Sequence, residues 1–276
     1  MREVSKNKKK EIQEEILAFY EKNKREFAWR QTTNPYHILL SEVMLQQTQT
    51  TRVQTYYNIF LKEFPKLPNL AFCPKDKLLR LWQGLGYNNR VLRLQTCCKE
   101  ILEKQKTNPI FFTEKEIPKE EELLKLSGIG PYTARAILAF AYNQEVPVID
   151  TNIRRILLSK LALPIDTKTP ELEYYAKELI PKGRSRIWHN AVMDYAALEL
   201  TARKSGISPL TKQSKFEGST RQIRSIILKH LLENKSEKKE KLYKLLPQRE
   251  DLQEILMKME KDKLLRLCED SVELAK

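Results

Sequence analysis

The chain has 276 residues, of which 50 are Lys or Arg and 36 are Asp or Glu, so its formal net charge at pH 7 is +14. This basic excess suits a polyanion such as nucleic acid, but a lysine-rich solvated surface has the same composition, and composition alone leaves the two readings even. Only seven glycines interrupt long stretches rich in Leu, Lys and Glu, which predicts an all-α fold with at most a small hairpin.

The four cysteines are far apart or adjacent in the sequence, and none has a partner at metal-ligand spacing. We therefore expect no zinc or iron–sulfur site and no cofactor. The N-terminal segment has no apolar signal core, and no apolar run reaches the roughly 18 residues that a membrane span needs. These patterns predict a cytoplasmic protein, associated with the nucleoid if the source is prokaryotic.

Apolar residues at helical spacing predict an amphipathic helix near the N-terminus, containing Ile12 and Ile16. Prolines and glycines separate further predicted helices. They cover residues 36–47, 50–62, 76–82, 90–104, 119–126, 131–143, 152–161, 171–180 and 186–202.

The apolar periodicity lapses in "RKSGISPLTKQSKFEG", which is typical of a linker. The sequence thus predicts a helical domain of two lobes over 1–205, a linker over 206–218 and a second domain over 219–276. Three helical patterns and a hairpin turning at Glu269 to Ser271 favour a winged-helix-like unit there. A plain helical packing domain fits the same pattern.

Glu42 lies inside an apolar run, "ILLSEVMLQQTQ". Burying a lone ionised carboxylate costs several kcal/mol unless it is paired or protonated, so its presence indicates a use. Downstream, "LLKLSGIGPYTARAIL" places a Gly-x-Gly turn between two apolar helices, which predicts a helix-hairpin-helix. There Gly128 and Gly130 are expected to adopt backbone geometry closed to other residues and bring N–H groups to a phosphate. An ordinary αα-hairpin with a glycine cap is the alternative.

Asp150 follows a short apolar run in "VPVIDTNIRRILL" and precedes a predicted helix. Asp is a common N-cap, and capping is the better explanation of Asp150 taken alone. In combination with Glu42 and the Gly-x-Gly hairpin, however, a functional role for Asp150 gains weight over capping alone.

Over roughly residues 11–203 the sequence resembles the helix-hairpin-helix DNA glycosylases, and most closely the MutY-type adenine DNA glycosylases. The resemblance rests on "FAWR", "NPYHILLSEVMLQQTQT", "LWQGLGYNNR", "LSGIGPYTARAIL" and "VIDTNIRRIL". It implies excision of adenine, flipped out of the duplex, where it faces guanine or 8-oxoguanine.

The resemblance also implies roles for single residues. Glu42 matches the general acid that protonates adenine at N7, and its apolar setting would raise its pKa enough for that. Asp150 matches the carboxylate that stabilises the oxocarbenium-like sugar, with Asn152 as a polar partner. Tyr132 matches a position beside the sugar where the similar endonuclease III branch has a lysine that leads to strand cleavage. Tyr132 cannot form a Schiff base, so we expect a monofunctional glycosylase.

Further matches concern DNA and the base. Gln47 and Tyr87 match residues that wedge into the base stack, although Tyr87 could equally be core and Asn88 stands where the family has a second aromatic residue. The other expected DNA-binding residues are Gln46, Gly128, Gly130 and Arg154. The expected base-pocket residues are Arg25, Trp29, Arg30 and Asp194.

The sequence also departs from the family. No cysteines lie between Cys98 and Cys268, where most relatives hold an iron–sulfur cluster, so we expect a clusterless member. The C-terminal unit stands where relatives carry a Nudix-like domain that reads 8-oxoguanine. Alternatives are therefore a thymine or uracil glycosylase acting opposite guanine, and a non-catalytic DNA-binding protein. The expected partner is double-stranded DNA with a mismatch or oxidised guanine, bound by a monomer without membrane contact.

Overall fold

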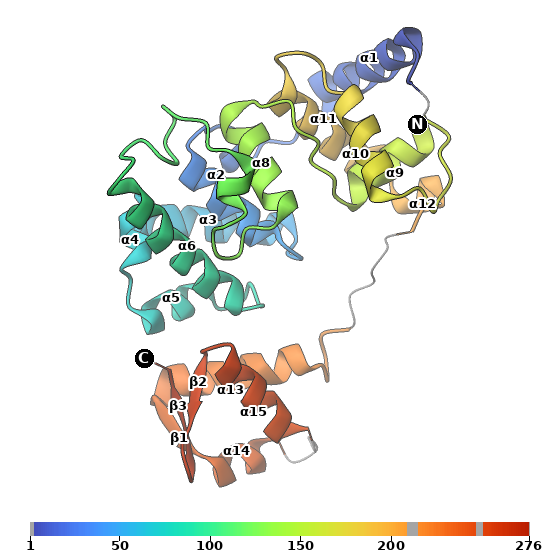
Figure 1. The fold of residues 1–276 in the computed structure, drawn as a ribbon. Coiled ribbons are helices and arrows are strands. Elements are labelled where there is room, and N and C mark those ends of the chain that lie inside the picture. Colours follow the sequence, from blue (N-terminus) through green and yellow to red (C-terminus); the bar gives the residue numbers. More distant parts are fainter. Residues whose placement is uncertain (1–2, 209–214, 247–250, 276) are drawn as a thin grey trace. The chain divides into compact units, whose positions relative to one another are not determined.

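The computed structural model describes residues 3–208, 215–246 and 251–275. Within these ranges the chain forms fifteen α-helices, one 3-10 helix and three short strands, which confirms the predicted mostly helical class (Figure 1). None of the helices in this described part is both long and apolar enough to cross a membrane.

The chain divides into two compact units, and each is made of two separate segments. The first comprises Met1–Glu42 and Glu103–Lys212, and the second comprises Val43–Leu102 and Gln213–Lys276. The predicted limits of 1–205, 206–218 and 219–276 follow chain order instead and stay a prediction. Residues 209–214 of the predicted linker lie outside the described residues.

The first unit is built around α11, which spans Ser185–Leu198. This helix packs against α1 (Lys6–Asn23), α8 (Pro131–Tyr142) and α9 (Thr151–Lys160). Apolar residues at helical spacing in these elements face one another and form the core, among them Ile12, Ile16, Ile156, Leu157, Trp188 and Val192. The unit also contains η1 (Ala28–Arg30), α7 (Glu120–Leu123), α10 (Thr169–Glu178) and α12 (Ala202–Ser205). Most of α2 (Pro35–Leu45) belongs to it as well.

The second unit begins with the end of α2 and continues through four helices: α3 (Thr50–Glu63), α4 (Leu67–Ala71), α5 (Lys75–Trp82) and α6 (Asn89–Gln105). The rings of Phe60 and Trp82 meet edge to face in its core, 5.5 Å apart. Two thiols of α6 are also buried here; burial raises the pKa of Cys97 to about 12 and that of Cys98 well above its ordinary value. The apolar periodicity of the sequence did not predict α4, because Pro68 is typical of a helix break. Proline is nevertheless well tolerated in the first turn of a helix, which is where Pro68 lies.

The C-terminal segment of the second unit has the element order of a winged helix. It runs α13 (Thr220–Asn234), β1 (Ser236–Lys238), α14 (Lys239–Leu245), α15 (Leu252–Lys261), β2 (Leu265–Leu267) and β3 (Ser271–Leu274). The strands form an antiparallel sheet in the order β1-β3-β2. The predicted hairpin is present and closes with a bond from the Cys268 amide to the Ser271 carbonyl, whereas the polar strand β1 was not predicted.

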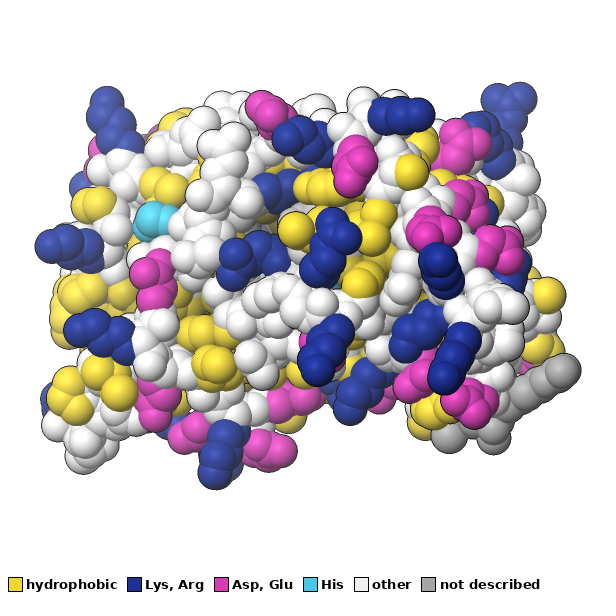
Figure 2. Space-filling view, turned by 90° about the horizontal axis from the view of Figure 1, so that it is seen from above, with side chains coloured by type: hydrophobic (Ala, Val, Ile, Leu, Met, Phe, Trp, Pro, Cys, Tyr) yellow, Lys and Arg dark blue, Asp and Glu magenta, His cyan; other side chains and the backbone are white. Residues whose placement is uncertain are grey.

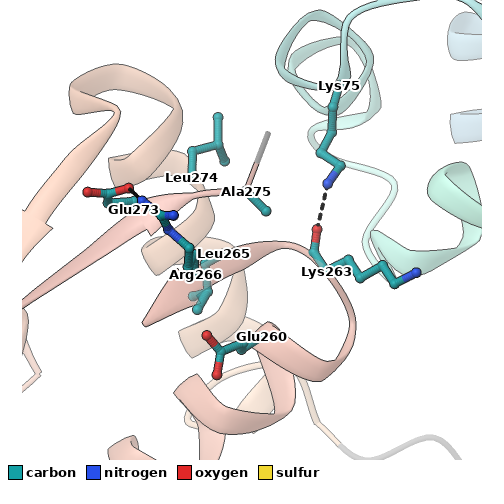
Figure 3. Close-up of a pocket in the computed structure, with 8 residues that line it drawn as sticks. All are labelled: Lys75, Glu260, Lys263, Leu265, Arg266, Glu273, Leu274 and Ala275. Carbon is teal, nitrogen blue, oxygen red and sulfur yellow. Dashed lines mark hydrogen bonds and ion pairs between the residues drawn. The ribbon is translucent and has the colours of Figure 1, made fainter. Parts of the chain in front are cut away.

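A pocket lies beside β2 and β3 of this segment, with Lys75 of α5 also lining it (Figure 3). The Lys75 ammonium donates to the Lys263 carbonyl at 3.0 Å, and Arg266 pairs with Glu273 at 2.6 Å. Charges of both signs therefore line the pocket and bond to neighbouring protein groups. Figure 2 shows a similar mixture over one face of the molecule, where Lys and Arg side chains are interspersed with acidic and apolar ones.

Candidate active site

Glu42 is the buried carboxylate of α2. The helix begins at Pro35, and the Asn34 side chain caps it by accepting from the amides of Tyr36 and His37 at 3.0 and 3.3 Å. Glu42 is only 6% exposed. Burial raises its pKa to about 7, and the negative charge of Asp150 acts in the same direction. Burial in the apolar run thus accounts for the raised pKa of Glu42, and its role as a proton donor stays a prediction.

Tyr132 comes from the second residue of α8, directly after Pro131. Its hydroxyl is hydrogen-bonded to the Glu42 carboxyl. Burial raises the pKa of Tyr132 well above its ordinary value, and the nearby charges of Glu42 and Asp150 add to this shift. The phenol therefore stays protonated and acts as a hydrogen-bond donor to Glu42.

Asp150 is the N-cap of α9. Its Oδ1 accepts from the amides of Asn152 at 2.8 Å and Ile153 at 2.7 Å, and its Oδ2 accepts from the Asn152 side-chain amide at 3.0 Å. The net effect is a raised pKa of Asp150, because burial outweighs these donors and the charge of Arg155, which lower it. The side chain is partly accessible to solvent. Asp150 is thus a helix cap, and its charge also acts on the pKa of Glu42. Its catalytic role stays a prediction.

Two residues that sequence reasoning did not single out hold Asp150 in place. Arg155 donates to the Asn152 side-chain oxygen at 3.3 Å, and its positive charge favours the ionised form of Asp150. His189 accepts from the Val148 amide at 3.3 Å and so fixes the segment that leads to α9. Burial lowers the pKa of His189 to about 4, which keeps the ring neutral. The only sequence signal for a role of Arg155 was its place in "NIRR". His189 is a lone histidine, and nothing in the sequence indicated its role.

The two carboxyls of this site, Glu42 and Asp150, are both affected by burial but differ in their hydrogen-bond donors. Glu42 has apolar neighbours and one hydroxyl donor, which favours its neutral form near pH 7. Asp150 has three N–H donors and the N-terminus of α9, both of which favour its anionic form. The pKa values of both carboxyls are raised; that of Glu42 reaches about 7, while the donors to Asp150 oppose its rise. In such a pair Glu42 can deliver a proton, and Asp150 in its ionised form can stabilise a developing cation.

The hairpin between α7 and α8 corrects one prediction. Gly128 has φ +79°, the left-handed geometry that favours glycine. Gly130, the N-cap of α8, has φ −98° and ψ 179°, which any residue adopts, so the expectation that both glycines need special geometry is wrong for Gly130. A Cβ at Gly130 would meet no atom within 4 Å. The predicted phosphate contact at this turn remains a prediction.

The predicted base-pocket residues form a compact ionic cluster. The Asp194 side chain is fully buried in α11 and accepts four hydrogen bonds, from the Arg25 amide and side chain and from two nitrogens of Arg30, at 2.6 to 2.9 Å. Trp29 stacks on Phe27 with ring centroids 4.7 Å apart. This cluster ties η1 to α11; its contact with a flipped base stays a prediction.

Arg154, a predicted DNA contact on α9, is buried. Its guanidinium donates to the carbonyl of Ile165 in the segment after α9. The structure thus shows an internal role for this side chain, and its DNA contact stays a prediction.

The predicted wedge residues lie in the second unit. Gln47 is exposed and has φ +54°, and Tyr87 is partly exposed with φ +48°. Both belong to short turns, after α2 and before α6 respectively, and Gln46 lies in the first of them. The Tyr87 ring has the Arg90 guanidinium 5.6 Å from its centroid. Sequence reasoning quoted Arg90 within "LWQGLGYNNR" and assigned it no role.

Known proteins with similar sequences are DNA glycosylases. An adenine DNA glycosylase of Mycolicibacterium smegmatis is 31% identical over 236 residues, which cover 78% of each chain. An adenine DNA glycosylase of Buchnera aphidicola is 36% identical over 66% of this chain and 51% of its own length. The human adenine DNA glycosylase is 30% identical, and the match covers 79% of this chain and 40% of that protein. The chain thus spans about half or less of the latter two relatives.

Solved structures agree on the fold. A thermostable thymine-DNA glycosylase superposes with a TM-score of 0.63 at 25% identity, covering 72% of this chain and 90% of that one. A trapped covalent complex of endonuclease III with DNA gives 0.61 at 20% identity, over 75% and 92%. The family described as HhH-GPD superfamily base excision DNA repair protein matches residues 40–182, and these include Glu42, Tyr132 and Asp150. The chain belongs to the HhH-GPD superfamily of base excision DNA repair proteins.

Proposed function

We propose that this protein is a monofunctional adenine DNA glycosylase that hydrolyses the N-glycosidic bond of adenine mispaired with guanine or 8-oxoguanine. The observation that carries the proposal is the set of Glu42, Tyr132 and Asp150, in which a buried carboxyl with a pKa raised to about 7 lies close to a carboxylate that accepts three N–H donors. The relatives named adenine DNA glycosylase support adenine as the target.

In the proposed reaction, protonated Glu42 gives its proton to N7 of the flipped adenine. The glycosidic bond then breaks with its electron pair on the base, which leaves as neutral adenine. The Tyr132 hydroxyl orients the Glu42 carboxyl. Asp150, ionised by its N–H donors, stabilises positive charge on the sugar until water adds at C1′ and loses a proton. The products are free adenine and an abasic site.

The first test measures base release from duplexes with A, T or U opposite G or 8-oxoguanine. We expect adenine release from both A-containing duplexes, because a proton delivered to N7 helps only a purine to leave. The Asp150→Asn protein, prepared in parallel, controls for contaminating glycosylases. Release of none of the bases would reject the proposal.

Thymine opposite guanine is the second candidate substrate, because one similar solved structure is that of a thymine-DNA glycosylase. Release of thymine but not adenine in the same assay would replace the first candidate by this one.

Tyr132 leads to a prediction about strand cleavage. A tyrosine offers no amine, so wild-type product should break only after alkali or heat, and borohydride should trap no enzyme on DNA. Tyr132→Lys places an amine where the phenol now bonds Glu42, and we expect this variant to be trapped. The matched control is Tyr132→Phe, which keeps the ring and removes the hydroxyl. Efficient trapping of wild type would show that another lysine attacks the sugar and that the protein is bifunctional.

A further inference from the structure

Arg90, at the start of α6, is a buried cation that no carboxylate accompanies among its described contacts. It is 9% exposed. Its two terminal nitrogens lie within hydrogen-bond distance of six oxygen atoms, and five of these are backbone carbonyls. Burial lowers the pKa of Arg90 to about 10, which still leaves it charged at neutral pH. A buried charge is costly, so its carbonyl partners must be held in fixed positions around it.

The six oxygens belong to two segments that are far apart in the sequence. Nη1 contacts the carbonyls of Val43, Met44 and Gln46 at 2.5 to 3.0 Å. Nη2 contacts the carbonyls of Leu85 and Gly86 at 3.0 Å and the Thr48 hydroxyl at 3.2 Å. The planar, five-donor fork of arginine suits this arrangement, since one side chain bonds two backbones at once.

The first segment includes the end of α2. Val43 and Met44 lie in the last turn of this helix, where carbonyls have no partner within the helix and the dipole favours a cation. Arg90 therefore caps the C-terminus of α2, the helix that carries Glu42, and also bonds the turn that follows this helix.

The two segments contain the positive-φ residues Gln47 and Tyr87. Left-handed backbone at a non-glycine residue costs on the order of 1 kcal/mol or more and persists only where the surroundings impose it. Arg90 bonds both sides of Gln47, at Gln46 and Thr48, and bonds Leu85 and Gly86 directly before Tyr87. Its guanidinium also lies 5.6 Å from the Tyr87 ring centroid and 5.2 Å from that of Trp82.

We propose that Arg90 is a positioning residue that fixes the Gln47 turn and the Tyr87 turn in one relative geometry, so that both side chains enter the duplex together. The inference rests on the proposed function, because it assigns Arg90 to opening the duplex and leaves bond cleavage to Glu42 and Asp150. A lysine in its place would keep the charge but lack the fork, and could not bond both turns.

The test compares Arg90→Lys with Arg93→Lys, which changes an exposed arginine on the same helix. Single-turnover rates at saturating enzyme are measured on adenine in a mismatched duplex and on adenine in a pre-opened bulge. We expect Arg90→Lys to lose rate on the order of tens-fold on the duplex and about threefold or less on the bulge, since small displacements of positioning groups have effects of up to about 10²-fold. The alkaline limb of the pH profile should not move, because Glu42 sets it. Equal losses on both substrates, or no loss on the duplex, would overturn the proposal.

A second measurement does not need catalysis. In the Asp150→Asn background, 2-aminopurine placed beside the target adenine should gain fluorescence on enzyme binding, and Arg90→Lys should reduce that gain severalfold. If the parent shows the gain and Arg90→Lys matches it, the Arg90 proposal fails while the proposed function stands. If the parent shows no gain, both the wedge and the Arg90 proposal fail, and adenine release by wild type decides the proposed function separately.

If Arg90→Lys does not fold, Thr48→Val tests the same proposal. It removes one of the six acceptors and leaves the five carbonyls, so we expect a loss in the same direction on the duplex but smaller. A double-mutant cycle with Tyr87→Ala adds a further check. If Arg90 acts through the wedge, the two losses on the duplex are not additive, and full additivity contradicts the proposal.

Discussion

Asp150→Asn is expected to lower the single-turnover rate of adenine release on the order of 10³-fold and to leave duplex binding within a few fold. The substitution removes the anion that stabilises the developing sugar cation, and electrostatic groups of this kind contribute effects of about that size. We expect binding to survive because the substitution removes no cationic group that could bind a phosphate.

The fold should tolerate this change. Asparagine is as good an N-cap as aspartate, and its side-chain oxygen can keep both backbone amide bonds. Its NH2 group cannot accept from the Asn152 side chain as Oδ2 does, so we expect a loss of no more than about 1.5 kcal/mol in the free energy of unfolding. Asp166→Asn, at an exposed position after α9, is the matched control and should keep full activity. Near wild-type release by Asp150→Asn in single turnover would remove Asp150 from the mechanism.

Glu42→Gln should lower the rate by about 10²- to 10⁴-fold, because a neutral amide cannot deliver a proton. The wild-type rate should also fall about tenfold per pH unit above pH 7, as Glu42 loses its proton with a pKa of about 7. The variant should lack this limb. A variant that kept both the rate and the pH profile of wild type would make Glu42 a structural residue only.

Glu42→Gln is also predicted to increase the free energy of unfolding at alkaline pH. Glu42 ionises near pH 4.5 when unfolded and near pH 7 when folded. Its neutral form therefore contributes stability that is complete below pH 4.5 and is lost as the pH rises to 7. At pH 8 the free energy of unfolding of Glu42→Gln should exceed that of wild type by up to about 3 kcal/mol, and at pH 4 this advantage should vanish. Denaturant unfolding at both pH values tests this, with exposed Glu121→Gln as the control.

Helices that bury an apolar stripe were predictable from the sequence, since their spacing reports directly on their packing. The elements that were missed are short or polar, such as α4 with its early proline and β1 with the sequence "SEK". Helix α4 has a proline in its first turn, and the same residue is also typical of a helix break. Strand β1 forms only by pairing with the distant strand β3, which the local sequence does not indicate.

The sequence singled out residues of the candidate site where their chemistry is unusual for their local sequence, and their roles stay predictions. Glu42 stood out because its neighbours are apolar, and Asp150 because it occurs in combination with Glu42 and the Gly-x-Gly hairpin. Arg90 could not be assigned from the sequence, since its six acceptors are mostly backbone carbonyls of two turns whose positions follow from the tertiary fold. Gly130 was misjudged for a related reason: the letters "GIG" do not say which glycine takes the left-handed backbone.

The left-handed turns at Gln47 and Tyr87 also bear on how this chain evolves. If stability alone were selected, glycine or asparagine would be favoured at both positions, because these residues adopt positive φ at little cost. A lineage that no longer needed to open DNA should therefore drift toward small residues at 47 and 87 and gain stability as it did so. If the predicted wedge role of Gln47 and Tyr87 holds, a lineage under selection for repair would keep both large side chains in strained backbone and so trade stability for activity at these two sites.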